Sequence, residues 1–362
     1  MSPLMKQVEK AGIKGLKTKR NPVKVSVDDF FHESEQVRGA YSRLIENDDP
    51  NRVVIIPSVS YGLANVAQNL PFNDGEILLA EEQFPSNVYP WVRLKEKGFT
   101  INVVSPPQSD NRGESWNEKI LDAINSKTRM VAVGHIHWSD GTLFQLKTIR
   151  EKLDEVGGLL VIDGTQSIGA LPFSVKEIRP DALVCAGYKW LMGPYSIGLA
   201  YYGSAFDEGR PIEENWINRK GSDDFGNLVN YQETYREKAL RYEVGEHSNF
   251  ILVPMIHQAI KQLLRWSPEN IQQYTHDLMA DSITEMTAMG YRVENAAWRA
   301  NHLLGVRLPS GVELSRVQQS LKKHRVSVSF RGDSIRISPN IYNDEMDVRK
   351  LLKAMKEPIF AS

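Results

Sequence analysis

The sequence predicts an α/β protein in which a mainly parallel sheet lies between helices, followed by a smaller α+β domain. Three observations support this fold class. Short apolar runs alternate with helical patterns through the first two hundred residues, an order typical of parallel sheets. Several of these runs are apolar without interruption, as expected when both faces of a strand are buried. After about residue 205 the alternation stops and a polar, irregular stretch follows.

Seven apolar runs are the candidate strands of the main sheet. They cover residues 53–57, 76–80, 100–105, 130–135, 159–163, 182–186 and 197–202. The helical patterns between them cover residues 61–70, 88–97, 118–125 and 146–156. The pair Gly157-Gly158 ends the last of these patterns directly before a strand, as glycine does at helix C-termini.

The second half of the chain predicts a long loop and a separate small domain. Residues 207–232 are polar and irregular, and helical patterns follow at 250–266 and 271–289. From residue 291 to the end, the order is strand, strand, helix, strand, strand, helix. We therefore predict a large domain at residues 20–248 and a small C-terminal domain at 249–362, with residues 1–19 packing beside the small domain.

Composition excludes several classes of protein. Lys and Arg total 44 against 45 Asp and Glu, and this balance gives no basis for binding nucleic acid or an anionic membrane. A single cysteine, Cys185, excludes an internal disulfide. No apolar run reaches the roughly 18 residues of a membrane span, and the basic N-terminus lacks the apolar core of a secretion signal. We expect a cytoplasmic protein without membrane or nucleic-acid partners.

Two strand ends carry the residue types of a cofactor site. Asp163 ends an apolar strand and is followed by Gly-Thr-Gln, and Lys189 stands between two aromatic residues after another apolar strand. Ligands bind at the carboxyl ends of strands in such sheets. A carboxylate there can pair with a protonated ring nitrogen, and a desolvated lysine can attack an aldehyde. Either residue alone has an ordinary structural explanation, a turn aspartate or a surface lysine, but the pair favours a site.

A third segment, Val-Val-Ile-Ile-Pro-Ser-Val-Ser-Tyr from residue 53, leads from a strand into a helix that we expect to start near Tyr61. Backbone N–H groups and hydroxyls at such a helix start bind phosphate. Ser60 is also a suitable N-cap residue, so this segment alone is weakly specific.

In this order, the three segments resemble the aminotransferase class V family, the branch of pyridoxal-phosphate (PLP) fold-type I that includes cysteine desulfurases, kynureninase and isopenicillin epimerase-like proteins. The resemblance covers nearly the whole chain, and Asp-Gly-Thr-Gln and Tyr-Lys-Trp-Leu-x-Gly-Pro are its specific parts. It implies PLP as the cofactor, a Schiff base on Lys189, Asp163 on the pyridine nitrogen and Gln166 on the phenolic oxygen. Val59, Ser60 and Tyr188 would contact the phosphate.

The resemblance also assigns two aromatic residues to the cofactor pocket. Phe84 stands where the family places a ring stacked on the cofactor, although core packing would also explain it. Trp138 stands where the family lines the pocket, often with asparagine. Because tryptophan departs from the desulfurases at this position, we expect it to narrow the substrate space.

Two later segments match the family as well. Residues 333–344 resemble its late arginine strand, and Arg336 would bind the substrate α-carboxylate with its planar guanidinium. Residues 240–250 resemble the segment that reaches the cofactor phosphate of the neighbouring subunit, which implies a homodimer with active sites at the interface. Glu246 replaces the usual hydroxyl residue there, so His247 or Ser248 would be the donor.

The chain departs from the desulfurases in one respect that bears on activity. Those enzymes need a nucleophilic cysteine ahead of the late arginine, and residues 309–335 contain none. Cys185 lies in a predicted buried strand, where a thiol is a small core side chain. His135 and His137 alternate at a strand end, so their side chains should face opposite sides, and we expect no metal site.

These observations predict a PLP-dependent enzyme acting on an amino acid through Lys189, with amino transfer as the first choice. β-Elimination at a C–S bond and epimerisation begin with the same proton transfer and remain alternatives. A non-catalytic PLP-binding protein is a further alternative. A nucleotide-dependent enzyme is set aside because the sequence has neither G-x-G-x-x-G after its first strand nor G-x-x-x-x-G-K-[ST].

Overall fold

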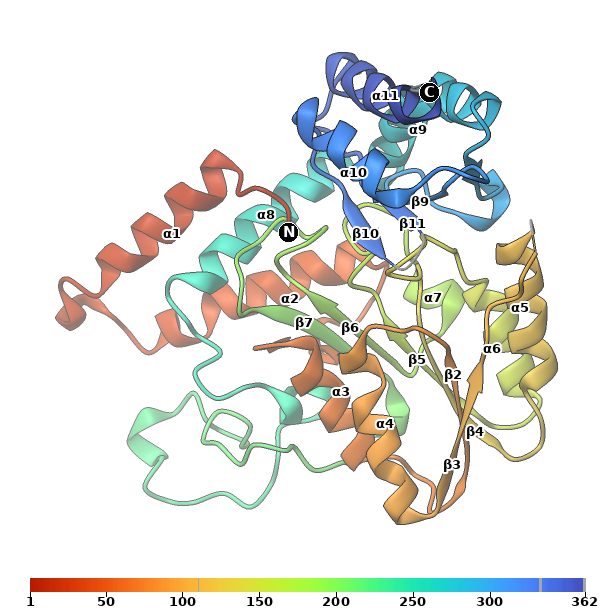
Figure 1. Cartoon of the computed structure of the whole chain (residues 1–362). Helices are drawn as coiled ribbons and strands as arrows, with labels where there is room; N and C mark the ends of the chain where they lie inside the picture. Colours follow the sequence, from red (N-terminus) through yellow and green to blue (C-terminus); the bar gives the residue numbers. More distant parts are fainter. Residues whose placement is uncertain (110, 332–333, 361–362) are drawn as a thin grey trace.

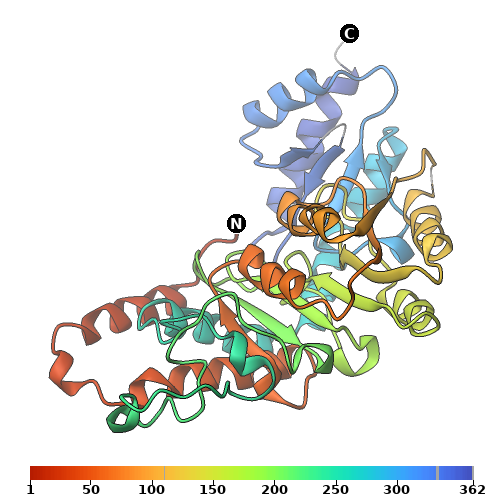
Figure 2. The same ribbon diagram turned by 90° about the horizontal axis from the view of Figure 1, so that it is seen from below.

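The computed structural model describes residues 1–109, 111–331 and 334–360. A large sheet covered by helices forms the body of the molecule, and a smaller sheet with its own helices stands at one end (Figure 1). Seen from below, helices α1 and α2 and the irregular residues 207–237 extend from the opposite end (Figure 2). Asp333, the first residue of the predicted arginine segment, lies outside the described residues.

The main sheet confirms the predicted fold class. Within the described residues it has seven strands: β1 (Val53–Ile56), β2 (Gly75–Ala80), β3 (Phe99–Val104), β4 (Thr128–Gly134), β5 (Leu159–Asp163), β6 (Ala182–Ala186) and β7 (Gly198–Tyr202). Their order across the sheet is β1-β7-β6-β5-β4-β2-β3. All neighbouring pairs are parallel except those of β7, which runs antiparallel to both β1 and β6. The short connection from β6 to β7 explains the reversal, because a parallel return needs a longer crossover.

Alternation along each strand sends side chains into two separate cores. In β1, Val53 and Ile55 join one apolar cluster, whereas Val54 and Ile56 join the other. The covering helices are α2 (His32–Leu44), α3 (Val59–Gln68), α4 (Tyr89–Arg93), α5 (Arg112–Ala123), α6 (Leu146–Asp154), α7 (Val175–Ile178) and α8 (Leu252–Trp266). Helices α3 and α4 cover one face with side chains such as Leu63 and Trp91, and the others pack on the opposite face.

Helix α1 (Lys6–Thr18) packs along α8, which in turn packs on α2 (Figure 1). Two glycines of α1, Gly12 and Gly15, are buried in this contact. A Cβ atom on Gly15 would overlap the carbonyl oxygen of Phe250, so the two segments approach as closely as a bare backbone allows.

The C-terminal part has its own core. It contains α9 (Pro268–Ala288), β8 (Arg292–Val293), β9 (Leu304–Arg307), α10 (Leu314–Lys323), β10 (Ser329–Arg331), β11 (Ser334–Ile337) and α11 (Glu345–Phe360). Strand order is β10-β11-β9-β8, and all pairs are antiparallel. Helix α8, in contrast, contributes Val253, Ile256, Ile260 and Leu263 to the core of the large sheet. The predicted domain boundary at residue 249 stays a prediction.

The remaining chain is irregular or forms short 3-10 turns. These turns are η1 (Pro22–Lys24), η2 (Asp28–Phe30), η3 (Pro50–Arg52), η4 (Pro85–Asn87), η5 (Leu94–Lys97), η6 (Ser204–Phe206), η7 (Phe225–Asn227), η8 (Lys238–Tyr242) and η9 (Ala296–Trp298). The predicted long loop at 207–232 is irregular apart from η7. Within the described part of the chain, no helix combines the length and the apolar character that a bilayer crossing requires.

Candidate active site

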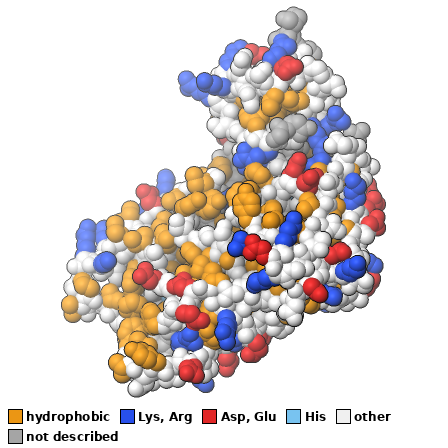
Figure 3. Space-filling view, turned by 60° about the horizontal axis from the view of Figure 1, so that its bottom comes forward, with side chains coloured by type: hydrophobic (Ala, Val, Ile, Leu, Met, Phe, Trp, Pro, Cys, Tyr) orange, Lys and Arg blue, Asp and Glu red, His pale blue; other side chains and the backbone are white. Residues whose placement is uncertain are grey.

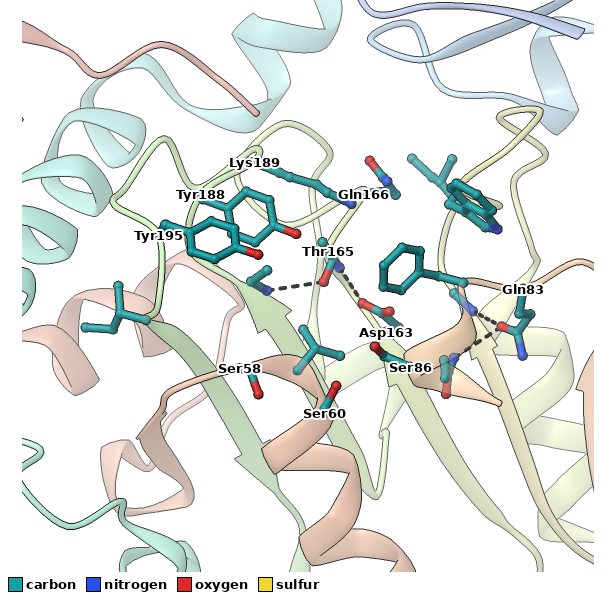
Figure 4. A pocket seen from close by; sticks show the side chains of 18 of the residues that line it. Ser58, Ser60, Gln83, Ser86, Asp163, Thr165, Gln166, Tyr188, Lys189 and Tyr195 are labelled. Carbon is teal, nitrogen blue, oxygen red and sulfur yellow. Dashed lines mark hydrogen bonds between the residues drawn. The ribbon is translucent and has the colours of Figure 1, made fainter. Parts of the chain in front are cut away.

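A cavity of about 300 Å³ opens at the carboxyl ends of the parallel strands (Figure 4). Eight of the predicted site residues line it: Val59, Ser60, Phe84, Trp138, Asp163, Gln166, Tyr188 and Lys189. The other three predicted residues, Arg336, His247 and Ser248, lie outside its wall. The fold therefore brings together segments that are far apart in the sequence.

Lys189 reaches into the cavity from the connection between β6 and β7. Backbone hydrogen bonds fix this connection, with the Gly187 N–H donating to Ile197 O at 2.9 Å and the Gly193 N–H donating to Gly187 O at 2.8 Å. A Cβ on Gly187 would press against the same Ile197 oxygen, so the close approach requires glycine. The Lys189 Nζ lies 5.4 Å from the centroid of the Phe84 ring.

The surroundings of Lys189 favour its neutral amine. Burial lowers the pKa of Lys189 most, and the positive charges of Arg336 and Arg331 lower it further, against the opposing effect of Asp163. A neutral amine is the nucleophilic form of lysine. This chemistry is what a carbonyl-binding lysine needs.

Asp163 lies at the end of β5, beneath Lys189 and Gln166 in Figure 4. Its Oδ1 accepts the Thr165 N–H at 3.0 Å, and the Thr165 hydroxyl accepts the Ala186 N–H at 3.2 Å. Burial raises the pKa of Asp163, although the hydrogen bonds from Thr165 partly oppose this rise. A cationic partner in the cavity would therefore stabilise the ionised carboxylate.

The start of α3 forms the lower wall of the cavity, where Figure 4 shows Ser58 and Ser60. The helix begins at Val59, and Ser58 is its N-cap, since the Ser58 Oγ accepts the Tyr61 N–H at 3.2 Å. The expectation that Ser60 caps a helix starting near Tyr61 was wrong, because the helix begins two residues earlier. This leaves the Ser60 hydroxyl and the first N–H groups of the helix available to an anion.

Aromatic rings form two sides of the cavity. Phe84 and Trp138 meet edge to face with centroids 5.5 Å apart, and the Trp138 Nε1 donates to Glu82 O at 2.6 Å. Across the cavity, the rings of Tyr188 and Tyr195 lie 4.5 Å apart. Phe84 is 39% exposed, so it is a cavity wall rather than a core residue.

Gln83, which was not among the predicted site residues, holds the turn that carries Phe84. Its Nε2 donates to Ala132 O at 2.9 Å, and its Oε1 accepts both the Gly134 N–H and the Asn87 Nδ2 at 3.1 Å. This buried amide therefore joins the turn to the end of β4. Nothing in the periodicity of the sequence marks it, because its role depends on contacts between distant segments.

Other lining residues were also absent from the prediction: Ser58, Ser86, Thr165 and Tyr195. Two of them stood within segments singled out for other residues, Ser58 in Pro-Ser-Val-Ser and Thr165 in Asp-Gly-Thr-Gln. A hydroxyl next to a predicted site residue is the signal that could have identified them.

Gln166 is held from both ends. Its side-chain Oε1 accepts the Trp190 Nε1 at 3.2 Å, and its backbone carbonyl lies 2.8 Å from the Nε2 of His302. The Nδ1 of His302 lies 2.7 Å from the Gln272 Nε2, which can only donate. The His302 ring is therefore neutral with its proton on Nε2. Because Trp190 occupies only the Oε1 of Gln166, its side-chain NH₂ could donate to a ligand.

Arg336 lies on β11, close behind the cavity. Its Nη1 donates to Trp138 O at 2.6 Å and its Nη2 donates to the Ser329 Oγ at 3.4 Å. Burial lowers the pKa of Arg336, and the charge of Arg331 adds to this effect. A carboxylate beside Arg336 would offset both its burial and the repulsion from Arg331.

His247 and Ser248 lie apart from the cavity. The His247 ring is buried in its own chain, with Nε2 3.0 Å from Phe30 O, and its backbone carbonyl accepts the Ser34 hydroxyl at 3.2 Å. The proposed contact with a neighbouring subunit's cofactor stays a prediction. Because the His247 ring has these internal contacts, Ser248 is the better candidate.

The donor set fits pyridoxal phosphate. A buried lysine, a carboxylate, an aromatic ring and a helix start with a hydroxyl all face one cavity. These groups match the aldehyde, pyridine nitrogen, ring face and phosphate of that molecule.

Comparison with known families gives a match over most of the chain. The model of the family described as aminotransferase class-V matches residues 12–351. An uncharacterized aminotransferase of Bacillus subtilis, YcbU, is 26% identical over 321 residues, which cover 88% of this chain and 82% of that protein. Isopenicillin N epimerase of Amycolatopsis lactamdurans is 24% identical, and the match covers 85% of this chain and 81% of that protein.

Among solved structures, the complex of the cystine C–S lyase C-DES with its product cysteine persulfide superposes with a TM-score of 0.84 at 20% identity. The superposition covers 99% of this chain and 94% of that one. At this identity, the likeness shows a shared fold.

Proposed function

Because the chain belongs to the aminotransferase class-V family, we propose that it is an aminotransferase that acts on an amino acid through Lys189. Its cofactor is pyridoxal phosphate, as the family implies and the donor set fits. The observation that carries the proposal is the placement of Lys189 and Asp163 in one cavity, where burial lowers the pKa of the lysine.

When bound, pyridoxal phosphate supplies an aldehyde that condenses with amines and a ring that delocalises the electron pair left at the substrate α-carbon. Asp163 would keep the ring nitrogen protonated, and the start of α3 would hold the phosphate with Ser60. Phe84 would cover the ring, and the NH₂ group of Gln166 would donate to its phenolic oxygen.

Lys189 would move the proton that decides the reaction. Its Nζ would act as the general base toward the substrate α-carbon within the same cavity. Burial and the nearby arginines lower the pKa of Lys189, which favours that role. Arg336 would bind the α-carboxylate and so fix the α-carbon in front of Lys189.

A desulfurase reaction that uses a thiol of the chain itself lacks support. The sequence has one cysteine, and Cys185 lies buried in β6 with its Sγ directed at Gly164 O. Burial raises the pKa of its thiol well above the ordinary value, so it stays a neutral core group.

We also propose that the active unit is a homodimer. Hydrophobic side chains are spread over the face that Figure 3 presents, from the centre of the view to its lower left. Large apolar residues are exposed both at the cavity and on residues 207–237, among them Tyr195 at 63%, Val229 at 78% and Tyr231 at 95%. A second copy would cover such side chains. Light scattering should give twice the mass of the chain, and a monomer at micromolar concentration would contradict the proposal.

The function is tested by recording the visible absorbance of the protein loaded with PLP while a panel of L- and D-amino acids is added. Amino transfer predicts loss of the lysine-bound band and appearance of the aminated cofactor. Elimination would instead release ammonia and an oxo-acid, and epimerisation would invert the amino acid without either product. A stable band that responds to no amino acid would indicate a binding protein without turnover.

Replacing the lysine tests its role directly. Lys189→Ala should abolish turnover, because it removes both the covalent attachment point and the proton carrier, while PLP can still bind through the other groups. Absorbance and mass spectrometry would check the attachment, and stopped assays would check turnover. Lys176→Ala is the matched control, since this lysine is exposed and pairs with Asp48. Full activity of Lys189→Ala would refute the mechanism.

A further inference from the structure

A second, larger cavity lies on the other side of Trp138 from the cofactor site. Its volume is about 970 Å³, and Gln83 and Trp138 line both cavities. Four arginines from separate elements face it where the large sheet meets the small one: Arg112 of α5, Arg292 of β8, Arg307 of β9 and Arg331 of β10. Such convergence is typical of a site for an anion.

Acidic side chains balance only part of this charge. Asp140 pairs with Arg112 at 2.8 Å and with the His137 ring at 3.1 Å. Glu81 and Glu82 also line the cavity but are exposed, so water screens their charges. Within the described part of the chain, neither Arg307 nor Arg331 makes an ion pair.

Two buried guanidinium nitrogens point to a missing acceptor. The Nε atoms of Arg331 and Arg336 are both buried without a hydrogen-bond partner among the described residues. An unpaired buried donor on a charged group is costly, and a protein rarely keeps two of them close together. A bound anion would satisfy them.

Trp138 links the two arginines. The Arg331 guanidinium lies 5.1 Å from the centroid of its ring, and the Arg336 Nη1 donates to its backbone carbonyl. Because both arginines contact Trp138, a substrate whose α-carboxylate rested on Arg336 would have Arg331 within reach of its side chain, and Arg307 lines the same cavity as Arg331.

We propose that the substrate is an amino acid whose side chain ends in a second anionic group, held by Arg331 and Arg307 in the cavity beyond Trp138. The inference rests on the proposed function, because Arg336 and Lys189 must first bind the amino-acid end. The size of the cavity accommodates side chains longer than that of aspartate. Carboxylate and phosphate share the acceptor geometry that a guanidinium matches.

The first experiment compares acidic amino acids with neutral counterparts. L-Aspartate, L-glutamate, L-2-aminoadipate and O-phospho-L-serine are tested against asparagine, glutamine, norleucine and serine. We expect kcat/KM for the best acidic substrate to exceed that of its neutral counterpart by about 10- to 100-fold, as hydrogen bonds to charged groups imply. Preference for O-phospho-L-serine would identify phosphate as the anion, and preference for the others would identify carboxylate.

Variants assign the preference to the cavity. Arg331→Met and Arg307→Gln should each reduce the ratio of acidic to neutral kcat/KM by about tenfold or more, mainly by slowing the acidic substrate. Arg331→Lys should keep part of the ratio, because it retains the charge. Arg349→Gln is the matched control, as this exposed arginine of α11 pairs only with Glu345 in the described structure. A KM that rises equally for acidic and neutral substrates in Arg331→Met would show that Arg331 binds the α-carboxylate, and would overturn the proposal.

Binding without turnover provides an independent readout. Glutarate, which carries two carboxylates and no amine, should bind the unloaded protein in calorimetry, and Arg331→Met should weaken this binding about tenfold or more. If no amino acid alters the PLP absorbance yet glutarate binds as expected, the proposed function fails and the anion site stands. If neutral amino acids react as well as acidic ones and glutarate does not bind, the function stands and this inference fails.

Discussion

At the residue scale, Lys189 and Asp163 are two titratable side chains whose pKa values burial moves in opposite directions. Burial lowers the pKa of the lysine and raises that of the carboxyl, so both tend toward their neutral forms before the cofactor arrives. Bound PLP would bring a pyridinium to Asp163 and an aldehyde to Lys189. Each group is therefore prepared for the part of the cofactor that it faces.

Arg336→Gln should raise KM for the amino-acid substrate by about 10- to 100-fold, with a smaller effect on kcat. The reason is that its carboxylate contact is present in both the ground state and the transition state. Steady-state kinetics separate the two constants, and PLP binding should stay unchanged. An unaltered KM would mean that another arginine, with Arg331 the nearest candidate, receives the α-carboxylate.

The site residues differ in how readily the sequence reveals them. Asp163, Lys189 and Ser60 stand next to strand or helix ends within specific motifs, so their place in the cavity could be predicted. Gln83 could not, because its value lies in hydrogen bonds to β4 that no local pattern records. The same holds for His302, which reaches Gln166 from the far end of the chain.

At the scale of elements, the strands were predicted closely because each is a buried apolar run. The antiparallel direction of β7 could not be predicted, since an apolar run does not indicate whether its strand runs parallel or antiparallel to its neighbours. Helix starts were less certain, and α3 begins at Val59 rather than near Tyr61. Ser58, three residues before Tyr61, competes with Ser60 as the N-cap, and only the folded geometry decides between the two.

Gly15→Ala should detach α1 from α8, because the new Cβ would overlap the Phe250 carbonyl. Hydrogen exchange of residues 6–18 would check this, with faster exchange expected throughout the helix. Gly39→Ala in α2 is the matched control, since the added Cβ would meet only the end of the Arg43 side chain. That variant should be stabilised by about 0.5–1 kcal/mol through helix propensity. Unchanged exchange in Gly15→Ala would contradict the tight contact.

At the scale of the whole molecule, His302 joins the two parts of the protein. Its ring meets the Trp190 ring edge to face with centroids 4.4 Å apart, and it lies between the Gln166 carbonyl and Gln272 of α9. Burial lowers the pKa of His302 to about 4 from the ordinary value of 6.5. The unfolded chain therefore binds a proton that the folded protein excludes between these two pH values.

The free energy of unfolding should accordingly fall as pH drops from about 6.5 to about 4, and His302 should not affect its pH dependence above that window. Between pH 7 and pH 5, His302 alone accounts for a loss of about 2 kcal/mol. His302→Gln keeps a donor and an acceptor without the titration, so its loss over the same range should be smaller by that amount. Urea unfolding of the wild type and of His302→Gln, at the same protein concentration and at each pH, measures this difference in stability loss. Equal losses in the two proteins would contradict a buried neutral His302 ring.

The pairing of β1 with β7 has a consequence for the order in which the protein is made. Val53 pairs with Tyr201, so the first strand to leave the ribosome waits for the last strand of the main sheet before its hydrogen bonds can form. The start of α3, which follows β1, meets the lysine-bearing turn before β7 only after that closure. Truncated nascent chains that end before Tyr202 should therefore lack the cofactor, however many of the site residues they already contain.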